Sequence, residues 1–226
     1  IRQYFATEPT VGSPGTEEQG TGPVAYWRFD EHYGTTIHNT LESVSEDHLI
    51  GWWKMDETSG TTMYDEMKQK NVTVAGSPGR VTGITGNAYD FSGSTSQYAY
   101  ASDSPIHSIT GSLTLSAWIK PEAVVDGTSY VIAGKATNEP SPAYSYLLMQ
   151  YGDEMMFIIN SGGVFERTDA TNLAAGQWYH VAAVYNAQKA TAHIFVNGVR
   201  QNSTTTGTIP TSLTDRADYF TIGSLY

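Results

Sequence analysis

Short segments rich in β-branched and aromatic residues recur from residue 71 to residue 224, each bounded by Gly, Pro, Asp or Asn. This spacing is typical of an all-β sandwich or barrel, in which a turn follows each short strand. No segment of comparable length has the apolar spacing of an amphipathic helix. We therefore predict an all-β fold with very little helix. The expected strands are NVTVAG, NAYDFSG, QYAYAS, SLTLSAWIKP, SYVIAGK, YSYLLMQYG, EMMFIIN, QWYHVAAVYN, ATAHIFV, VRQNSTT and DYFTIGS.

Two segments give sharper local predictions. Every second residue from Leu113 to Ile119 is apolar, so this strand is expected to bury one face. In HIFVNGVRQ, Asn197 and Gly198 tolerate the positive φ angles of a type I′ turn, which predicts a tight hairpin.

Length, charge and the lack of cysteine limit the kinds of fold and partner that this chain can have. A chain of 226 residues suits one large β domain or two small ones, and it can bury a substantial core. The formal net charge is -11 and the basic residues are scattered along the sequence, which argues against nucleic acid as a partner. The absence of cysteine excludes disulfides and thiolate metal sites.

The composition also bears on location. No apolar run approaches the roughly 20 residues that a membrane-spanning helix needs, so we predict no membrane insertion. Gly, Tyr, Thr and Ser are plentiful, and only 15% of residues are charged. This balance resembles extracellular β-sandwiches more than cytosolic enzymes, and an extracellular or cell-surface location is expected.

One short stretch is nearly repeated. WWKMDETSGTT at residues 52–62 resembles YWRFDEHYGTT at residues 26–36, with a constant offset of 26 residues, as between Trp27 and Trp53. Only the opening of the later domain is duplicated. Residues 7 to 23 are rich in Pro, Gly, Thr and Glu and cannot offset their own ordering entropy. We therefore divide the chain into a flexible linker or tail (1–23), an orphan strand repeat with a connector (24–49) and a globular domain (50–226).

The order of several motifs resembles a known family. GWWKMDETSGTTMYDE, GITGNAYDFSGSTSQYAYAS, SLTLSAWIKPE, AGQWYHVAAVYN, ATAHIFVNGVR and YFTIGS occur in sequence. This series resembles the laminin-G-like branch of the concanavalin A-like lectin/glucanase superfamily, over about residues 50–226. The resemblance implies a jelly-roll sandwich of two antiparallel sheets, here preceded by an extended N-terminal segment. It also implies a binding or adhesion module of a larger secreted protein, often with calcium at a rim.

The sequence departs from the family pattern at one point. Family members continue past the IGS motif into a strand of the type G-x-I-D-E-x-x-I-Y, which lies beside the opening strand, so we expect residues 50–226 to lack this closing strand. A sheet edge without a partner recruits extended segments. VAYWRFD at residues 24–30 could occupy that edge, in its own chain or in a neighbour, and exchange between neighbours would build a filament. Alternatively, residues 24–40 are the relic of a truncated tandem domain, or the start of a preceding domain interrupted by an insertion.

Candidate calcium ligands follow from family positions. Calcium takes six to eight oxygen ligands from carboxylates, carbonyls and water, which rim loops can supply. By resemblance, the candidates are Asp56, Glu57, Asp65 and Asp90. The competing interpretation is that Asp56 and Asp65 cap turns through their own side chains.

A carbohydrate site would need exposed aromatic rings beside polar groups. The available tyrosines are Tyr98, Tyr100, Tyr144, Tyr146 and Tyr151. Tryptophans within patterned strands are more often core residues than binding platforms. We therefore predict that the core takes up Trp52, Trp53, Trp118 and Trp178.

Motifs for catalysis are missing. Jelly-roll glycosidases of this superfamily carry paired carboxylates of the type ExDxxE on one strand, because alternate residues share a face. The sequence contains no Glu-x-Asp, no HxH or HExxH and no GxSxG. We predict that the protein is not an enzyme.

These observations lead to one function and one alternative. We expect a non-catalytic extracellular adhesion or assembly module, with strand exchange into a surface filament as its most specific form and calcium as a structural ion. The alternative is a carbohydrate-binding module of a larger secreted protein. Its partners would be other protein chains, including copies of itself, or surface glycans.

Overall fold

The computed structural model describes residues 49–93, 95–137, 143–160, 164–168 and 171–225. The chain divides into two compact units, Ile1–Leu49 and Ile50–Tyr226, and the fold below is that of the second. The predicted linker at residues 1–23 and the predicted orphan strand at residues 24–30 lie outside the described residues.

The described residues form an almost entirely β structure with one short 3-10 turn, η2 (Pro105–His107). Every strand pairing in it is antiparallel. The strands are β1 (Thr62–Met63), β2 (Val72–Ala75), β3 (Gly79–Thr82), β4 (Asn87–Asp90), β5 (Tyr98–Ala101), β6 (Leu113–Ile119), β7 (Ser129–Thr137), β8 (Ala143–Tyr151), β9 (Glu154–Ile159), β10 (Val164–Thr168), β11 (Tyr179–Asn186), β12 (Thr191–Val196), β13 (Val199–Arg200), β14 (Ser203–Thr206) and β15 (Phe220–Ile222).

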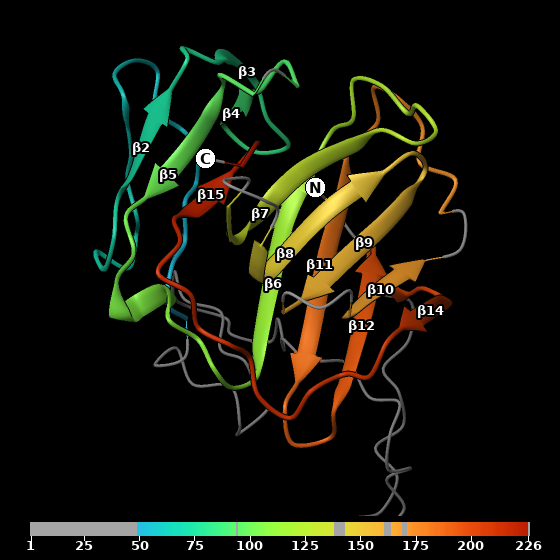
Figure 1. The fold of residues 1–226 in the computed structure, drawn as a ribbon. Helices are drawn as coiled ribbons and strands as arrows, with labels where there is room; N and C mark the ends of the chain where they lie inside the picture. Colours follow the sequence, from blue (N-terminus) through green and yellow to red (C-terminus); the bar gives the residue numbers. More distant parts are fainter. Residues whose placement is uncertain (1–48, 94, 138–142, 161–163, 169–170, 226) are drawn as a thin grey trace, which may run out of the picture. The chain divides into compact units, whose positions relative to one another are not determined.

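Two larger sheets make the sandwich. A nine-stranded sheet has the order β1-β2-β5-β15-β7-β8-β9-β10-β14, and a four-stranded sheet has the order β13-β12-β11-β6. A small two-stranded sheet, β3-β4, completes the set. Figure 1 shows β7 to β10 stacked over β6, β11 and β12. The predicted all-β sandwich of antiparallel sheets is confirmed.

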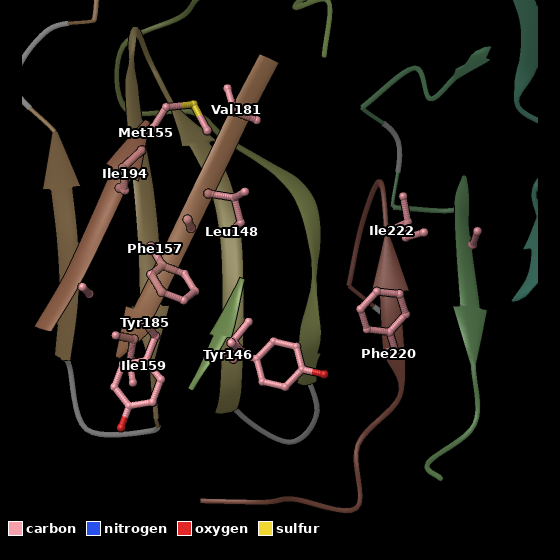
Figure 2. Close-up of a cluster of buried hydrophobic side chains, with 14 of the residues drawn as sticks. Tyr146, Leu148, Met155, Phe157, Ile159, Val181, Tyr185, Ile194, Phe220 and Ile222 are labelled. Atoms are coloured by element: carbon pink, nitrogen blue, oxygen red, sulfur yellow. The ribbon is translucent and has the colours of Figure 1, made fainter. Parts of the chain in front are cut away.

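The core lies between the two larger sheets. Side chains of β8 and β9 such as Leu148 and Phe157 point towards Val181 and Tyr185 of β11 and Ile194 of β12 (Figure 2). Each inward residue alternates with a more exposed neighbour on β11 and β12, as the pleat of a strand requires. Burial of these apolar side chains drives the packing of the two sheets.

The predicted strands match observed ones, apart from the following differences. β1, β3 and β10 were not predicted, and they have two, four and five residues. The segment VRQNSTT does not form one strand, because β13 pairs with β12 in the smaller sheet while β14 pairs with β10 in the larger one. The predicted hairpin turn is confirmed, since Asn197 and Gly198 have φ angles of 51° and 77°.

A buried ion cluster closes one end of the core. The side chain of Lys135 on β7 is fully buried, with 0% exposure. Its Nζ lies 2.7 Å from Asp103 Oδ1 and 2.5 Å from Asp215 Oδ1, and it donates a hydrogen bond of 3.1 Å to Ser108 Oγ. Both carboxylates are partly exposed at the rim. The two carboxylates and the hydroxyl therefore replace the hydration that the buried ammonium has lost, as a charge in a core requires.

His107 lies beside this cluster in an apolar setting. Its ring stacks on Phe220 with centroids 4.6 Å apart and lies 6.3 Å from the ring of Trp53. Among the described residues, neither ring nitrogen has a hydrogen-bond partner. Burial, followed by the positive charge of Lys135, lowers the pKa of His107 to about 4. The imidazole is therefore neutral in the folded protein at neutral pH.

Candidate functional site

Asp65, one of the predicted calcium ligands, organises the loop that follows it. Its carboxylate accepts four backbone N–H hydrogen bonds, from Trp52 and Met67 at Oδ1 and from Gln69 and Lys70 at Oδ2. Burial raises the pKa of Asp65, but the four backbone donors together outweigh it and the net pKa is lowered. The carboxylate is therefore ionised and acts as the centre of a turn, as the competing interpretation of Asp65 expected.

Other contacts hold the same loop. The Asn71 Oδ1 accepts a hydrogen bond of 3.0 Å from the Asp65 backbone N–H. The indole N–H of Trp53 donates to the carbonyl of Lys70 at 3.2 Å, and Trp53 itself packs on the core against Phe220. Residues 65–71 are thus tied to the core from both ends.

Replacing Asp65 with asparagine should destabilise the protein by about 2 kcal/mol, because the Nδ2 group cannot accept the backbone N–H donors and leaves two of them unpaired. Chemical denaturation followed by tryptophan fluorescence measures the change. Asp126→Asn is the matched control, because Asp126 is exposed and its replacement should change the free energy of unfolding by less than about 0.5 kcal/mol. Equal stability of the two variants would contradict the role assigned to Asp65.

The other predicted ligands lie in separate surroundings. Asp56 Oδ1 accepts a hydrogen bond from the backbone N–H of Asn87, and Glu57 Oε1 accepts one from the backbone N–H of Tyr64. Asp90 on β4 lies instead beside Glu122. Within the part of the chain that the structure describes, no three His, Asp or Glu side chains come together as a possible metal site.

The Asp90 and Glu122 pair is a feature that the sequence did not indicate. The charge of Asp90 raises the pKa of Glu122, and slight desolvation and a hydrogen bond with Asp90 add to the rise. The two residues are 32 positions apart, and only the fold brings their carboxyl groups together. Such a pair binds a shared proton or a cation more readily than an isolated carboxylate does.

A surface depression of about 450 Å³ lies over the loop that Asp65 holds, lined by residues 64–66 and 68–71. Tyr64, which lines the depression, is 59% exposed, and Trp52, whose backbone N–H bonds Asp65, is 50% exposed. Trp53 pairs with Asp65 in a single β-bridge; the Trp53 side chain packs on the core, and the Asp65 side chain is buried against the backbone of its loop. Because neighbours in an extended chain point to opposite faces, Trp52, Lys54, Tyr64 and Glu66 share the outer face.

We call Trp52, Lys54, Tyr64 and residues 66–71 the aromatic surface. Lys54 lies 5.1 Å from the centroid of the Trp52 ring, and its Nζ forms an ion pair of 3.2 Å with Glu66. With Lys68 and Lys70, this surface carries three of the six lysines of an acidic chain. The sequence prediction that basic residues are scattered missed this group, because Lys54 meets the loop only in the folded chain, through its ion pair with Glu66.

The structure corrects the prediction for the tryptophans. Trp53 packs on the core as predicted, but Trp52 and Trp118 are each 50% exposed, so the prediction is wrong for these two. Trp118 lies on the outer face of β6, where its ring meets that of His180 edge-on, and His180 Nε2 hydrogen-bonds with Ser116 Oγ at 2.8 Å. Among the tyrosines that the structure describes, Tyr146 is buried in the core, and the most exposed one, Tyr64, was not considered. A strand pattern shows alternation, but it does not show which side of an edge segment faces solvent.

The two packed antiparallel sheets define the fold class as a β-sandwich. The sequence profile of the Laminin_G_3 family, described as concanavalin A-like lectin/glucanases superfamily, matches residues 92–226. The chain belongs to this family, which confirms the resemblance seen in its motifs. No curated protein matches the sequence.

Solved structures support the same fold. The binding domain of Paraclostridial Mosquitocidal Protein 1 superposes with a TM-score of 0.56 at 12% identity, over 73% of this chain and 42% of that one. Trypanosoma rangeli sialidase in complex with sialic acid superposes with a TM-score of 0.50 at 14% identity, over 76% of this chain and 27% of that one. The chain thus spans less than half the length of either structure. At these identities the likeness concerns the fold alone.

The described part of the chain contains no helix with the length and apolarity that a membrane-spanning segment requires.

Proposed function

We propose that this chain is a non-catalytic extracellular adhesion module that binds carbohydrate at the aromatic surface. The observation that carries the proposal is the exposure of Trp52 and Tyr64 beside a surface depression on a loop held in place by Asp65. Exposed aromatic rings offer flat apolar faces to sugar rings, and the surrounding amide, carboxylate and ammonium groups can bind hydroxyls. Membership of a lectin-like family supports this use of the fold and an extracellular location.

The states of Asp65, buried beneath the aromatic surface, and of Glu66 on it support a binding role over a catalytic one. Asp65 is occupied by four backbone donors, and Glu66 is paired with Lys54. Glycoside hydrolysis needs two carboxyl groups on either side of the sugar linkage, one of them able to donate a proton. Neither Asp65 nor Glu66 is placed for glycoside hydrolysis.

The lysines favour glycans that carry carboxylate or sulfate groups. Lys68 is exposed at the depression, and Lys70 Nζ donates to Ser102 Oγ at 3.3 Å. Because the whole chain has a net charge of -11, a local group of lysines is where an anionic ligand meets the least repulsion.

Calcium binding belongs to the same proposal, at Asp90 and Glu122. Two carboxylates fit part of the oxygen shell of calcium, and backbone carbonyls and water would supply the rest. Asp65 is less suited to bind the ion, because backbone N–H groups already bond both of its oxygens. The ion would act structurally, by neutralising the charge shared by Asp90 and Glu122.

A glycan array tests the proposal directly. The protein should bind acidic glycans, and Trp52→Ala or Tyr64→Ala should weaken binding at least about tenfold, because a stacking face is lost. Stability should change by less than about 0.5 kcal/mol, since both side chains are exposed. Trp118→Ala is the matched control, because it removes an equally exposed tryptophan from the other sheet.

Two further experiments test the roles of the lysines and of calcium separately. Lys68→Gln with Lys70→Gln should weaken acidic glycans selectively, whereas Lys189→Gln, at an exposed position on another turn, should not. Repeating the array with a chelator, and with Asp90→Asn, tests the proposed calcium site. Absence of glycan binding, or equal loss in the Trp118→Ala control, would contradict a carbohydrate site at the aromatic surface.

A further inference from the structure

The aromatic surface is assembled from two segments of the chain. One is the opening segment, residues 52–54, and the other is the loop of residues 64–71. Hydrogen bonds join the two segments. The backbone N–H of Trp52 donates to Asp65 Oδ1 at 2.8 Å, and the backbone N–H of Glu66 donates to the carbonyl of Trp52 at 2.9 Å. The surface is therefore complete only while the opening segment stays in place.

The side chain of Trp53 anchors the opening segment. Among the described residues, Trp53 is joined to the sheet by one isolated bridge, to Asp65, and β1 at the end of that sheet has two residues. The indole N–H of Trp53 donates to the carbonyl of Lys70 at 3.2 Å, and its ring stacks on Phe220 with centroids 5.3 Å apart. Displacement of this ring would therefore separate the two halves of the aromatic surface.

The ring of His107 packs against the same two aromatic rings. It is 1% exposed, and its centroid lies 4.6 Å from that of Phe220 and 6.3 Å from that of Trp53. Among the described residues, neither ring nitrogen has a hydrogen-bond partner. A protonated imidazole carries a charge and two N–H donors, which are costly to bury without acceptors. The closed arrangement therefore disfavours the protonated ring.

The charged groups around His107 do not offset this cost. Four of them act on the ring from the elements packed around it: Lys135, Lys70, Asp65 and Asp103. Both carboxylates already have partners, since Asp65 accepts four backbone N–H groups and Asp103 pairs with Lys135, as does Asp215. Burial, followed by the charge of Lys135, outweighs the attraction of the carboxylates and lowers the pKa of His107 to about 4.

The other neighbours of the ring are held more firmly than the opening segment. The backbone N–H of His107 donates to the carbonyl of Ser104 at 3.0 Å, and the buried Tyr146 hydroxyl donates to the carbonyl of His107 at 3.0 Å. Phe220 lies on β15, which pairs with β5 on one side and with β7 on the other. The opening segment is therefore the neighbour that moves at the lowest cost.

We propose that acid opens the aromatic surface, because a proton on His107 displaces Trp53 and separates the opening segment from the loop of residues 64–71. The open form exposes the imidazole to water and binds the proton more tightly than the closed form, so opening becomes more favourable as the pH falls. With pKa values of about 4 in the closed form and 6.5 in the open one, the opening equilibrium rises about 20-fold between pH 7 and pH 5. Release of a bound glycan by acid rests on the proposed function, whereas the opening itself does not.

Hydrogen exchange measures the opening. The N–H groups that join the two segments are the amides of Trp52 and Glu66 and the indole of Trp53. After correction for the intrinsic effect of pH, their exchange should rise about 20-fold between pH 7 and pH 5 in the wild type, and less than about twofold in His107→Phe. Exchange that does not depend on pH in the wild type, or an equal rise in His107→Phe, would overturn the proposal.

Controls separate local opening from unfolding and from other titrating groups. The amides between β11 and β12 should exchange at least about tenfold more slowly at both pH values, and equal rates would overturn a local opening. His180→Phe removes a half-buried histidine of β11 and should keep the acid response. If His107→Phe loses its fold, as near-ultraviolet circular dichroism would show, His107→Leu provides the same comparison.

Heparin, a polysaccharide with sulfate and carboxylate groups, tests the consequence for binding. The apparent Kd rises as the closed fraction falls, so the loss of affinity between pH 7 and pH 5 should match the closed fraction from exchange and stay below about 20-fold. His107→Phe should bind equally well at both pH values. Absence of heparin binding at pH 7 would contradict a site for acidic glycans, while exchange would still decide the acid opening. Wild-type affinity that does not follow the closed fraction would overturn the link between His107 and the aromatic surface.

Discussion

Replacing both Asp103 and Asp215 with alanine is expected to lower the free energy of unfolding by about 3–5 kcal/mol. Among the residues that the structure describes, the double variant leaves the fully buried ammonium of Lys135 with Ser108 as its one hydrogen-bond partner. A buried charge without a counter-ion is costly, because the core cannot replace the solvation that water gives it. Either single variant should cost less, since the remaining carboxylate still pairs with the ammonium.

Lys135→Met separates this effect from a simple loss of contacts. Methionine fills a similar volume without a charge, and the two carboxylates left behind are partly exposed and can be hydrated. We expect a loss of only about 1–2 kcal/mol. Urea denaturation at pH 7 gives both values. A Lys135→Met variant as unstable as the double alanine variant would contradict the view that the buried cation dominates the cluster.

The contribution of Asp215 in this cluster to the free energy of unfolding depends on pH. The hydrogen bond from Lys135 is the largest cause that lowers the pKa of Asp215 below its ordinary value of 3.8. A carboxyl group whose pKa is lower in the folded state stabilises the protein above the unfolded pKa, and this contribution is lost as the pH falls through the folded value. The contribution of Asp215 is therefore complete at neutral pH and disappears only below about pH 3.8.

Replacing His107 with phenylalanine is expected to flatten the pH dependence of stability between pH 7 and pH 4. The pKa of His107 is about 4 in the folded state against 6.5 for an ordinary histidine. Below pH 6.5 the unfolded chain binds a proton that the folded one does not, so the wild type loses stability as the pH falls. The loss from this residue amounts to about 2 kcal/mol at pH 5 and about 3 kcal/mol at pH 4.

The phenylalanine variant keeps the stacking on Phe220 and has no group to protonate. At pH 7 its stability should lie within about 1 kcal/mol of the wild type. Urea denaturation at several pH values measures both slopes. His180→Gln is the control, because burial also lowers the pKa of the half-buried His180 but to a smaller extent, so it should flatten the slope less. Parallel profiles for His107→Phe and the wild type would contradict a neutral buried imidazole.

The local features of the fold were predictable because they depend on neighbours in the sequence. Alternation along Leu113–Ile119 and the Asn197–Gly198 turn follow from the geometry of a strand and from the φ angles that these residues tolerate. The exposed faces were harder to predict. Trp52 and Trp53 are adjacent, yet one faces solvent and the other the core, because the bridge between Trp53 and Asp65 orients them.

The sequence by itself determined the positions of most strands, the family and the absence of disulfides, since local pattern and composition carry that information. Only the tertiary structure decided which partners meet across long separations. Lys135 and Asp215 are 80 residues apart, and Asp90 meets Glu122 from a different element. The position of β6 at the end of its sheet, among the described strands, likewise appears only when the order of strands is known. Burial and pairing are properties of the assembled sheets, because each residue's surroundings come from segments that its own sequence context does not contain.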